Sequence, residues 1–195
     1  MKKTKLLIIG SGGHAKSCIE IIENIQKFKI MGLIDSKKNK TINKYKVILS
    51  DNEIMKIKSI SKNLVLGLGS VDNTNKRAEI FERYKKLGFH FPTIIAKGAT
   101  VSKNSKIGEG TIIFNHVLIN SGASIGENCI INNKTLIEHD VKIGDHAHIS
   151  TNVTINGNCK IGEKAFLGSG TILKNNLVVS KKSFIKMGSV IKTNQ

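Results

Sequence analysis

An aliphatic residue recurs at every sixth position from Ile95 to Ile191, and no insertion breaks the phase of this repeat. Four places after many of these residues comes a small one, such as Ala99 or Ala123. Glycine often follows the aliphatic residue directly, as in Ile125-Gly126. An internal repeat of this kind limits the possible folds more than any other feature, because each repeat forms one structural unit.

Six residues suit one short strand and one tight turn, and three such units close a triangular coil. The aliphatic residue of each unit then points inward and stacks on its equivalents at the strand spacing of about 4.8 Å. The second inward position must be small because it lies near a corner, and glycine or asparagine suits turns with positive φ. The period therefore predicts a parallel solenoid of about five coils. A solenoid of this kind can carry a functional site, and a purely structural role without such a site is the alternative. The pattern resembles that of the hexapeptide-repeat acyltransferases, which implies a left-handed β-helix.

Composition excludes several classes of protein. No stretch of the chain approaches the ~20 apolar residues of a membrane-spanning helix. The formal net charge is +17, but the lysines are spread along the chain without a basic block, so no nucleic-acid partner is expected. A positive field could instead attract anionic ligands such as coenzyme A and nucleotide sugars. Cys18, Cys129 and Cys159 lack metal-ligand spacing, so we expect packed thiols, no metal and a cytoplasmic location.

Residues 1–92 read as a small α/β domain before a β-helix domain of residues 93–195. The predicted elements alternate as βαβαβα, half of a doubly wound fold. The expected strands are Lys5–Ile9, Ile30–Ile34 and Leu64–Leu68, and the expected helices carry Ile19 to Phe28, Asn52–Ile60 and Ile80 to Leu87.

A glycine turn follows the first strand. Gly10-x-Gly12-x-x-Ala15, with Asp35 about twenty residues later, matches the dinucleotide-binding fingerprint. Glycines let the backbone approach a phosphate, and the following helix N-terminus adds positive potential. The domain is only half as large as a dinucleotide site requires, which favours a mononucleotide or nucleotide sugar over a dehydrogenase cofactor. A purely structural glycine turn is the alternative.

The combination of motifs resembles one family across essentially the whole chain. Gly10–Ala15 (GSGGHA), Leu33-Ile34-Asp35 and Gly67-Leu68-Gly69 before the hexads are similar to the bacterial sialic-acid and bacillosamine sugar acetyltransferases, the NeuD/PglD type. The resemblance implies an N-terminal domain that holds a sugar, often nucleotide-linked, and a β-helix that forms a homotrimer and binds acetyl-CoA between subunits. By the same resemblance, the sugar-nucleotide contacts are Gly12, Gly13, His14, Asp35 and Gly69.

The segment Ile137–Asp140 resembles the catalytic segment of this family. An acceptor that attacks a thioester must lose a proton, and imidazole accepts protons near neutral pH. We therefore predict His139 as general base and Asp140 as the carboxylate that orients it, with Glu138 as the alternative partner. Neighbouring strand residues face opposite sides, so the pairing requires a turn or a neighbouring subunit.

The resemblance also implies an acetyl-CoA site. His148 lies half a coil after His139 and is expected to contact the thioester region across a subunit boundary, while Ser169 lies in a small-residue segment that admits the pantetheine arm. His116 and His146 are interpreted as surface residues. The repeat cysteines point inward, so direct transfer is favoured over a covalent intermediate. The C-terminal segment departs from the pattern of the family, so coenzyme A is expected to be held more loosely or by lysines such as Lys174, Lys181 and Lys186.

These observations predict an acetyl-CoA-dependent enzyme that acetylates the amine of a nucleotide-linked amino sugar for surface-glycan biosynthesis. O-acetylation of a sialic-acid-like sugar is the alternative within the enzyme class. A non-catalytic scaffold that binds a sugar nucleotide is the alternative outside it.

Overall fold

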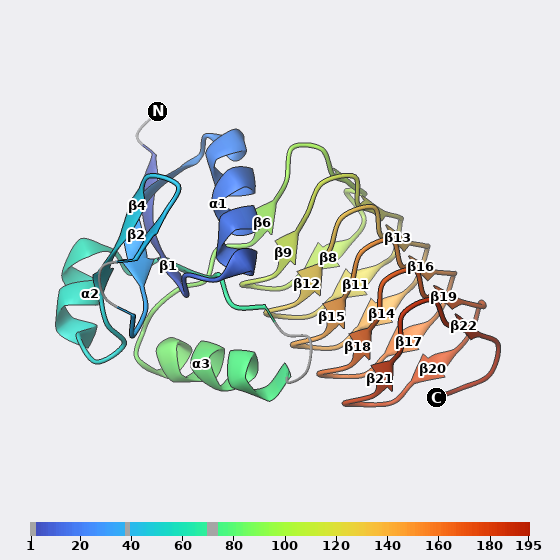
Figure 1. Cartoon of the computed structure of the whole chain (residues 1–195). Coiled ribbons are helices and arrows are strands. Elements are labelled where there is room, and N and C mark those ends of the chain that lie inside the picture. Colours follow the sequence, from blue (N-terminus) through green and yellow to red (C-terminus); the bar gives the residue numbers. More distant parts are fainter. Residues whose placement is uncertain (1–2, 38–39, 70–73) are drawn as a thin grey trace. The chain divides into compact units, whose positions relative to one another are not determined.

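The computed structural model describes residues 3–37, 40–69 and 74–195 of the chain (Figure 1). It divides into two compact units, which are described separately. The first unit contains Met1–Gly69 and Glu79–Pro92, and the second contains Ser70–Ala78 and Thr93–Gln195. Helix α3 contributes residues to both units.

The first unit is built on one sheet with the strand order β3-β4-β2-β1-β5. Every pair in this sheet is parallel except β3 with β4. The interior strand β1, which lies between β2 and β5, is buried from Leu6 to Ile9, as expected for a parallel strand that is covered on both faces. The elements that precede the β-helix are β1 (Thr4–Ile9), α1 (Gly13–Ile25), β2 (Phe28–Ile34), β3 (Thr41–Ile42), β4 (Tyr45–Leu49), α2 (Ile54–Ile60), β5 (Leu64–Leu66) and α3 (Thr74–Lys86).

Three details differ from the sequence-based expectation. Helix α1 ends at Ile25 because Gln26 adopts a left-handed conformation with φ of 59°, so Phe28 begins β2 and does not extend the helix. The hairpin of β3 and β4 was not predicted, and it adds a further parallel strand beside β2. Strand β5 ends at Leu66, two residues before the predicted end.

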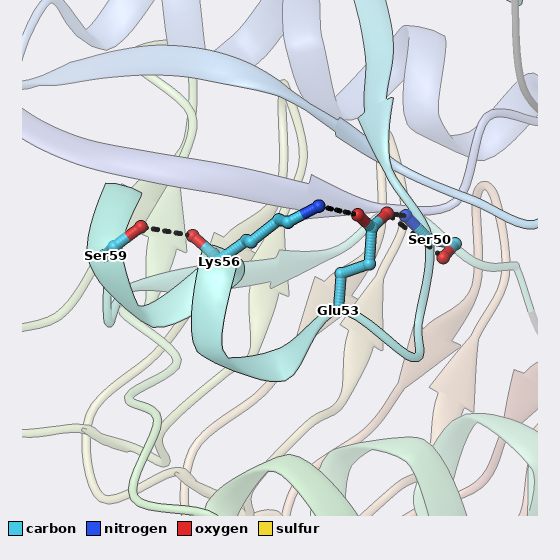
Figure 2. Close-up of polar contacts among 4 residues, drawn as sticks. All are labelled: Ser50, Glu53, Lys56 and Ser59. Carbon is cyan, nitrogen blue, oxygen red and sulfur yellow. Dashed lines mark hydrogen bonds and ion pairs between the residues drawn. The ribbon is translucent and has the colours of Figure 1, made fainter.

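Helix α2 is anchored at its start by side chains (Figure 2). The carboxylate of Glu53 accepts hydrogen bonds from the backbone N–H and the hydroxyl of Ser50, at 3.0 and 3.2 Å. The ammonium group of Lys56 donates to the same carboxylate at 2.8 Å. Together these donors lower the pKa of Glu53 to about 2, with Lys56 as the largest cause. The side chain therefore fixes the chain where it enters the helix.

The second unit is the predicted left-handed parallel β-helix, in which short strands stack coil upon coil (Figure 1). Each coil contributes one strand to each of three faces. The first face has β6 (Ile94–Ile95), β9 (Ile112–Ile113), β12 (Ile130–Ile131), β15 (His148–Ile149), β18 (Phe166–Leu167) and β21 (Phe184–Ile185). The second has β7 (Thr100–Val101), β10 (Leu118–Ile119), β13 (Leu136–Ile137), β16 (Thr154–Ile155), β19 (Ile172–Leu173) and β22 (Val190–Ile191). The third has β8 (Lys106–Ile107), β11 (Ser124–Ile125), β14 (Lys142–Ile143), β17 (Lys160–Ile161) and β20 (Val178–Val179).

The core of the β-helix consists of the repeated aliphatic residues and the small residues at the second inward position. Ile137, Ile149 and Ile155 are fully buried, and partners one coil apart are in direct register, such as Ile137 with Ile155. Threonine is tolerated inside because its hydroxyl finds a backbone acceptor. Thr111 Oγ1, for example, donates to the carbonyl of Gly126 at 2.7 Å. The period of six therefore predicts both the faces and their register.

Candidate functional site

His139 and Asp140 form a hydrogen-bonded pair at the turn between β13 and β14. The Nδ1 atom of His139 lies 2.9 Å from Oδ2 of Asp140. The turn makes this possible, because Asp140 adopts a left-handed conformation with φ of 60°. Both side chains remain accessible, with exposed fractions of 60% and 64%. With Nδ1 engaged by the carboxylate, Nε2 is the imidazole nitrogen available to take a proton from another molecule.

Glu138 has a different partner. Its Oε2 atom accepts a hydrogen bond from Nδ2 of Asn120, one coil earlier, at 2.8 Å. The side chain is therefore held by the neighbouring coil on the second face. Of the two carboxylates considered as partners of His139, the structure pairs the imidazole with Asp140.

His148 lies on another side of the prism. It belongs to β15 on the first face and is buried, with its ring edge-on to Phe166 at a centroid distance of 5.1 Å. His139 stands at the corner between the second and third faces. A single chain therefore does not bring these two histidines together.

A cleft of about 570 Å³ lies on the first face and the corner that follows it. Phe184 stacks on Phe166 at 4.8 Å along the strand register and is 55% exposed. At the edge of the cleft, Oγ of Ser150 and Oγ of Ser169 are 2.8 Å apart. The complete lining is Ser150, Phe166, Gly168, Ser169, Phe184, Lys186 and Met187. The cleft is therefore a mainly apolar surface with a polar rim and one cation.

Sequence reasoning identified Ser169 but missed the aromatic part of this cleft. Phe166 and Phe184 occupy outward strand positions eighteen residues apart, which is one coil. A spacing of one coil between two outward phenylalanines could have indicated that their rings stack. Of the three lysines considered for coenzyme A, Lys186 lines the cleft, while Lys181 lies 3.9 Å from the carboxylate of Glu163.

The remaining histidines of the repeat differ from one another. His116 is exposed, as predicted. The prediction that His146 is a surface residue is wrong, because only 9% of it is exposed. Its Nδ1 atom lies 2.9 Å from Nδ2 of Asn128 in the preceding coil, where both residues have left-handed conformations. The corner therefore turns this ring back against the coil beneath it.

The glycine turn of the first unit is open. A Cβ added at Gly12 or Gly13 would have no heavy atom within 4 Å beyond its neighbours along the chain. By contrast, a Cβ at Gly67 would lie 2.8 Å from Ile8. Helix α1 begins at Gly13 without an acidic residue in its first turn, so its N-terminus keeps a positive potential. The open turn is therefore suited to an anionic group.

Asp35 stands next to this turn. Ser11 donates its hydroxyl to Oδ2 of Asp35 at 2.7 Å, and the backbone N–H of Lys37 donates to Oδ1 at 3.1 Å. Burial works against ionisation, but these hydrogen bonds outweigh it and hold the pKa of Asp35 below its ordinary value. A Cβ at Gly69 would contact His14 at 3.6 Å, so the loop after β5 reaches the same turn. Sequence reasoning named Asp35 but not Ser11.

The cysteines are buried thiols. Burial raises the pKa of Cys129 to about 12, so this thiol is neutral and a poor nucleophile. Within the described part of the chain, no group of three histidine, cysteine, aspartate or glutamate residues is placed to hold a metal ion. The same part contains no helix that is both long and apolar enough to cross a membrane.

Two family models match the chain. The PglD N-terminal domain matches residues 5–84, and the bacterial transferase hexapeptide, as six repeats, matches residues 122–157. The first match covers the glycine turn and Asp35, and the second covers His139 and His148. No curated protein matches the sequence.

Several solved structures share the fold over nearly the whole chain. The acetyltransferase domain of PglB from Neisseria gonorrhoeae FA1090, in complex with acetyl coenzyme A, is 26% identical with a TM-score of 0.90. That match covers 99% of this chain and 93% of that chain. A perosamine N-acetyltransferase from Caulobacter crescentus, solved as a histidine-to-asparagine variant with CoA and GDP-perosamine, is 25% identical with a TM-score of 0.92. That match covers 97% of this chain and 89% of that one.

WeeI from Acinetobacter baumannii AYE shares the fold at 21% identity and a TM-score of 0.85, over 98% of this chain and 93% of its own. All of these structures combine the two units in the same order along nearly the full length of the present chain. With a PglD N-terminal domain, hexapeptide repeats and this fold, the chain belongs to the NeuD/PglD-type sugar acetyltransferases.

Proposed function

We propose that this protein transfers the acetyl group of acetyl-CoA directly to the amine of a nucleotide-linked amino sugar, in the biosynthesis of a surface glycan. The observation that carries the proposal is the accessible His139–Asp140 pair at a corner of the β-helix. The relatives support the reactants, because one is solved with acetyl coenzyme A and another with CoA and GDP-perosamine.

In the proposed reaction, Nε2 of His139 accepts the proton that the amine loses as it attacks the thioester carbonyl. A carbon–nitrogen bond forms, and the carbon–sulfur bond then breaks as the tetrahedral intermediate collapses. The thiolate of CoA leaves and takes up a proton, which the imidazolium can return. Asp140 holds the proton on Nδ1 and stabilises the imidazolium that forms.

We assign acetyl-CoA to the cleft that contains Ser169. Its apolar floor of Phe166 and Phe184 suits the pantetheine arm, and Lys186 supplies a cation for a phosphate. Because His139 and this cleft lie on different sides of one prism, the proposal requires a homotrimer in which one subunit supplies the base and another supplies the cleft and His148.

The first unit is proposed to bind the sugar nucleotide. Gly12 and Gly13 leave open space at the N-terminus of α1, where phosphate groups are favoured. Asp35, which stays ionised, is suited to accept hydrogen bonds from a ribose or base. His14 and Gly69 complete the same loop cluster as proposed sugar contacts.

The test is acetyl-CoA consumption in the presence of UDP-, GDP- and CMP-linked sugars, with and without an amino group. His139→Ala is compared with His116→Ala, which removes an exposed histidine from another corner. We expect His139→Ala to lower kcat by at least about 10³-fold, and His116→Ala to leave turnover intact.

The same panel separates the alternatives. Turnover confined to hydroxyl acceptors would move the assignment to O-acetylation. Binding of a sugar nucleotide without turnover or acetyl-CoA binding would support the scaffold. Activity of the His139→Ala variant equal to that of the unsubstituted protein would show that His139 is not the general base.

A further inference from the structure

The imidazole of His139 lies directly against Gly157, which occupies the same turn position one coil later. A Cβ placed on Gly157 would be 2.6 Å from Nε2, 2.7 Å from Cε1 and 3.2 Å from Cδ2. Contacts below 3.0 Å are essentially never adopted by real Cβ atoms. Gly157 is buried, although its equivalents in the neighbouring coils are exposed. The imidazole therefore covers this glycine.

The turn itself does not require glycine at this position. The three nearest atoms to the added Cβ all belong to the His139 ring, and none belongs to the backbone. The backbone of Gly157 does not lie in the left-handed region either. The equivalent positions in other coils carry Lys103, Ser121 and Asn175. A side chain is thus compatible with the turn wherever no imidazole lies beneath it.

Other glycines of the β-helix are required for a different reason. A Cβ on Gly144 would lie 2.7 Å from the backbone nitrogen of Glu163, and one on Gly168 would also meet backbone atoms of the next coil. Those glycines permit the coils to stack. Gly157 differs from them because the three atoms nearest to its added Cβ all belong to the side chain of His139.

We propose that Gly157 is a positioning residue for the base: its missing side chain lets the His139 ring lie against the next coil while Nδ1 remains bonded to Asp140. This inference rests on the proposed function. The ring is held at two points, by Asp140 at Nδ1 and by the surface of Gly157 beneath Nε2. A methyl group at 157 would clash with Nε2 and Cε1 in this orientation, so the ring would have to move away from the next coil.

The test is Gly157→Ala, compared with Asn175→Ala in the same turn position one coil later. We expect Gly157→Ala to lower kcat about 10²-fold while KM changes less than threefold, since a displacement of about 1 Å in a reacting group costs about that much. Asn175→Ala should leave both constants unchanged. A loss expressed only in KM would overturn the proposal.

Two further measurements do not depend on acetyl transfer. The ¹⁵N shifts of the His139 ring report its tautomer, and Gly157→Ala should lower the fraction that carries the proton on Nδ1. In urea unfolding, Gly157→Ala should lower the midpoint in the native protein but not in the His139→Ala background. Unchanged ring shifts, or an equal loss of stability in both backgrounds, would show that the glycine serves the turn and would refute the proposal. Altered shifts without turnover in any variant would retain this inference and reject the proposed function.

Discussion

The stacked glycines of the β-helix and the pair Gly12 and Gly13 in the first unit differ in what surrounds them. Several glycines of the β-helix are needed because the backbone of the next coil closes over them, as at Gly144, where an added Cβ would lie 2.7 Å from Glu163 N. In the first unit, Gly12 and Gly13 have no heavy atom within 4 Å of an added Cβ. Gly12 also has an extended backbone that other residues adopt easily.

The difference separates glycines that serve the fold from glycines that serve a ligand. A glycine crowded by its own chain is explained by packing. A glycine that faces open space next to a helix N-terminus is not explained by packing, and the proposed sugar-nucleotide site offers another reason for it. The comparison can be tested by substitutions that should reverse their effects between the two units.

The largest effect is expected from Gly144→Ala. The new methyl group would press on the backbone of the next coil, which can yield only by separating the stacked strands, so we expect a loss of about 3 kcal/mol in unfolding free energy. Gly188→Ala is the matched control, because Gly188 has φ of +71° but no heavy atom within 4 Å. Its loss should be about 1 kcal/mol. Equal losses in urea unfolding would contradict the expectation that crowding by the next coil makes Gly144 the more costly site.

Gly12→Ser is expected to weaken ligand binding without lowering stability, the reverse of the expectation for Gly144→Ala. Serine suits the position that precedes a helix, so the stability should not fall. The side chain would enter the open space assigned to the sugar nucleotide, so affinity should fall about thirtyfold, or about 2 kcal/mol. Isothermal titration with GDP- and UDP-linked amino sugars measures this change. Unaltered affinity together with unaltered stability would show that this glycine serves neither folding nor binding.

The two units also differ in how far the sequence predicts them. The period of six predicts the faces, the inward residues and the register of the β-helix, because each coil contacts only its neighbours and repeats the same contacts. The first unit depends on contacts between distant segments. The β3–β4 hairpin and the end of α1 were missed for a different reason: Asn43 and Gln26 take left-handed conformations, which a non-glycine residue does not indicate in the sequence.

The candidate site likewise contains features that the sequence predicts and features that it does not. The pairing of His139 with Asp140 was predicted from the family resemblance, with a turn or a neighbouring subunit as its requirement, and the structure contains that hydrogen bond at a turn. The roles of these residues remain predictions. The burial of His146 depends on Asn128 in another coil, and the cleft depends on the stacking of Phe166 with Phe184. Such contacts require the register to be known before side chains are compared.

Alkaline pH should affect the β-helix through Cys129. Burial raises the pKa of this thiol from an ordinary value near 9.0 to about 12. Above pH 9 the unfolded chain loses a proton that the folded chain keeps, so stability falls as pH rises towards 12. At pH 10 the expected loss is about 1.4 kcal/mol. Urea unfolding of Cys129→Ser at pH 8 and pH 10 should show a smaller decline, and a decline equal to that of the parent would contradict this origin.

Acidic pH should affect the first unit through Glu53, with the smallest effect. The pKa of Glu53 is lowered to about 2 by Lys56 and by the N–H of Ser50. The ionised carboxylate therefore contributes fully to stability above about pH 4.5, and this contribution is lost as pH falls through 2. Because the carboxylate is at the surface, the effect should be local. Amide exchange at Ser50 should accelerate in Glu53→Gln at pH 6, but not in Glu20→Gln, which alters an exposed carboxylate on α1. Equal exchange in both variants would mean that the hydrogen bonds of Glu53 do not order the start of α2. The acid sensitivity of the first unit would then be expected to come from Asp35 and Glu23, whose pKa values are also lowered.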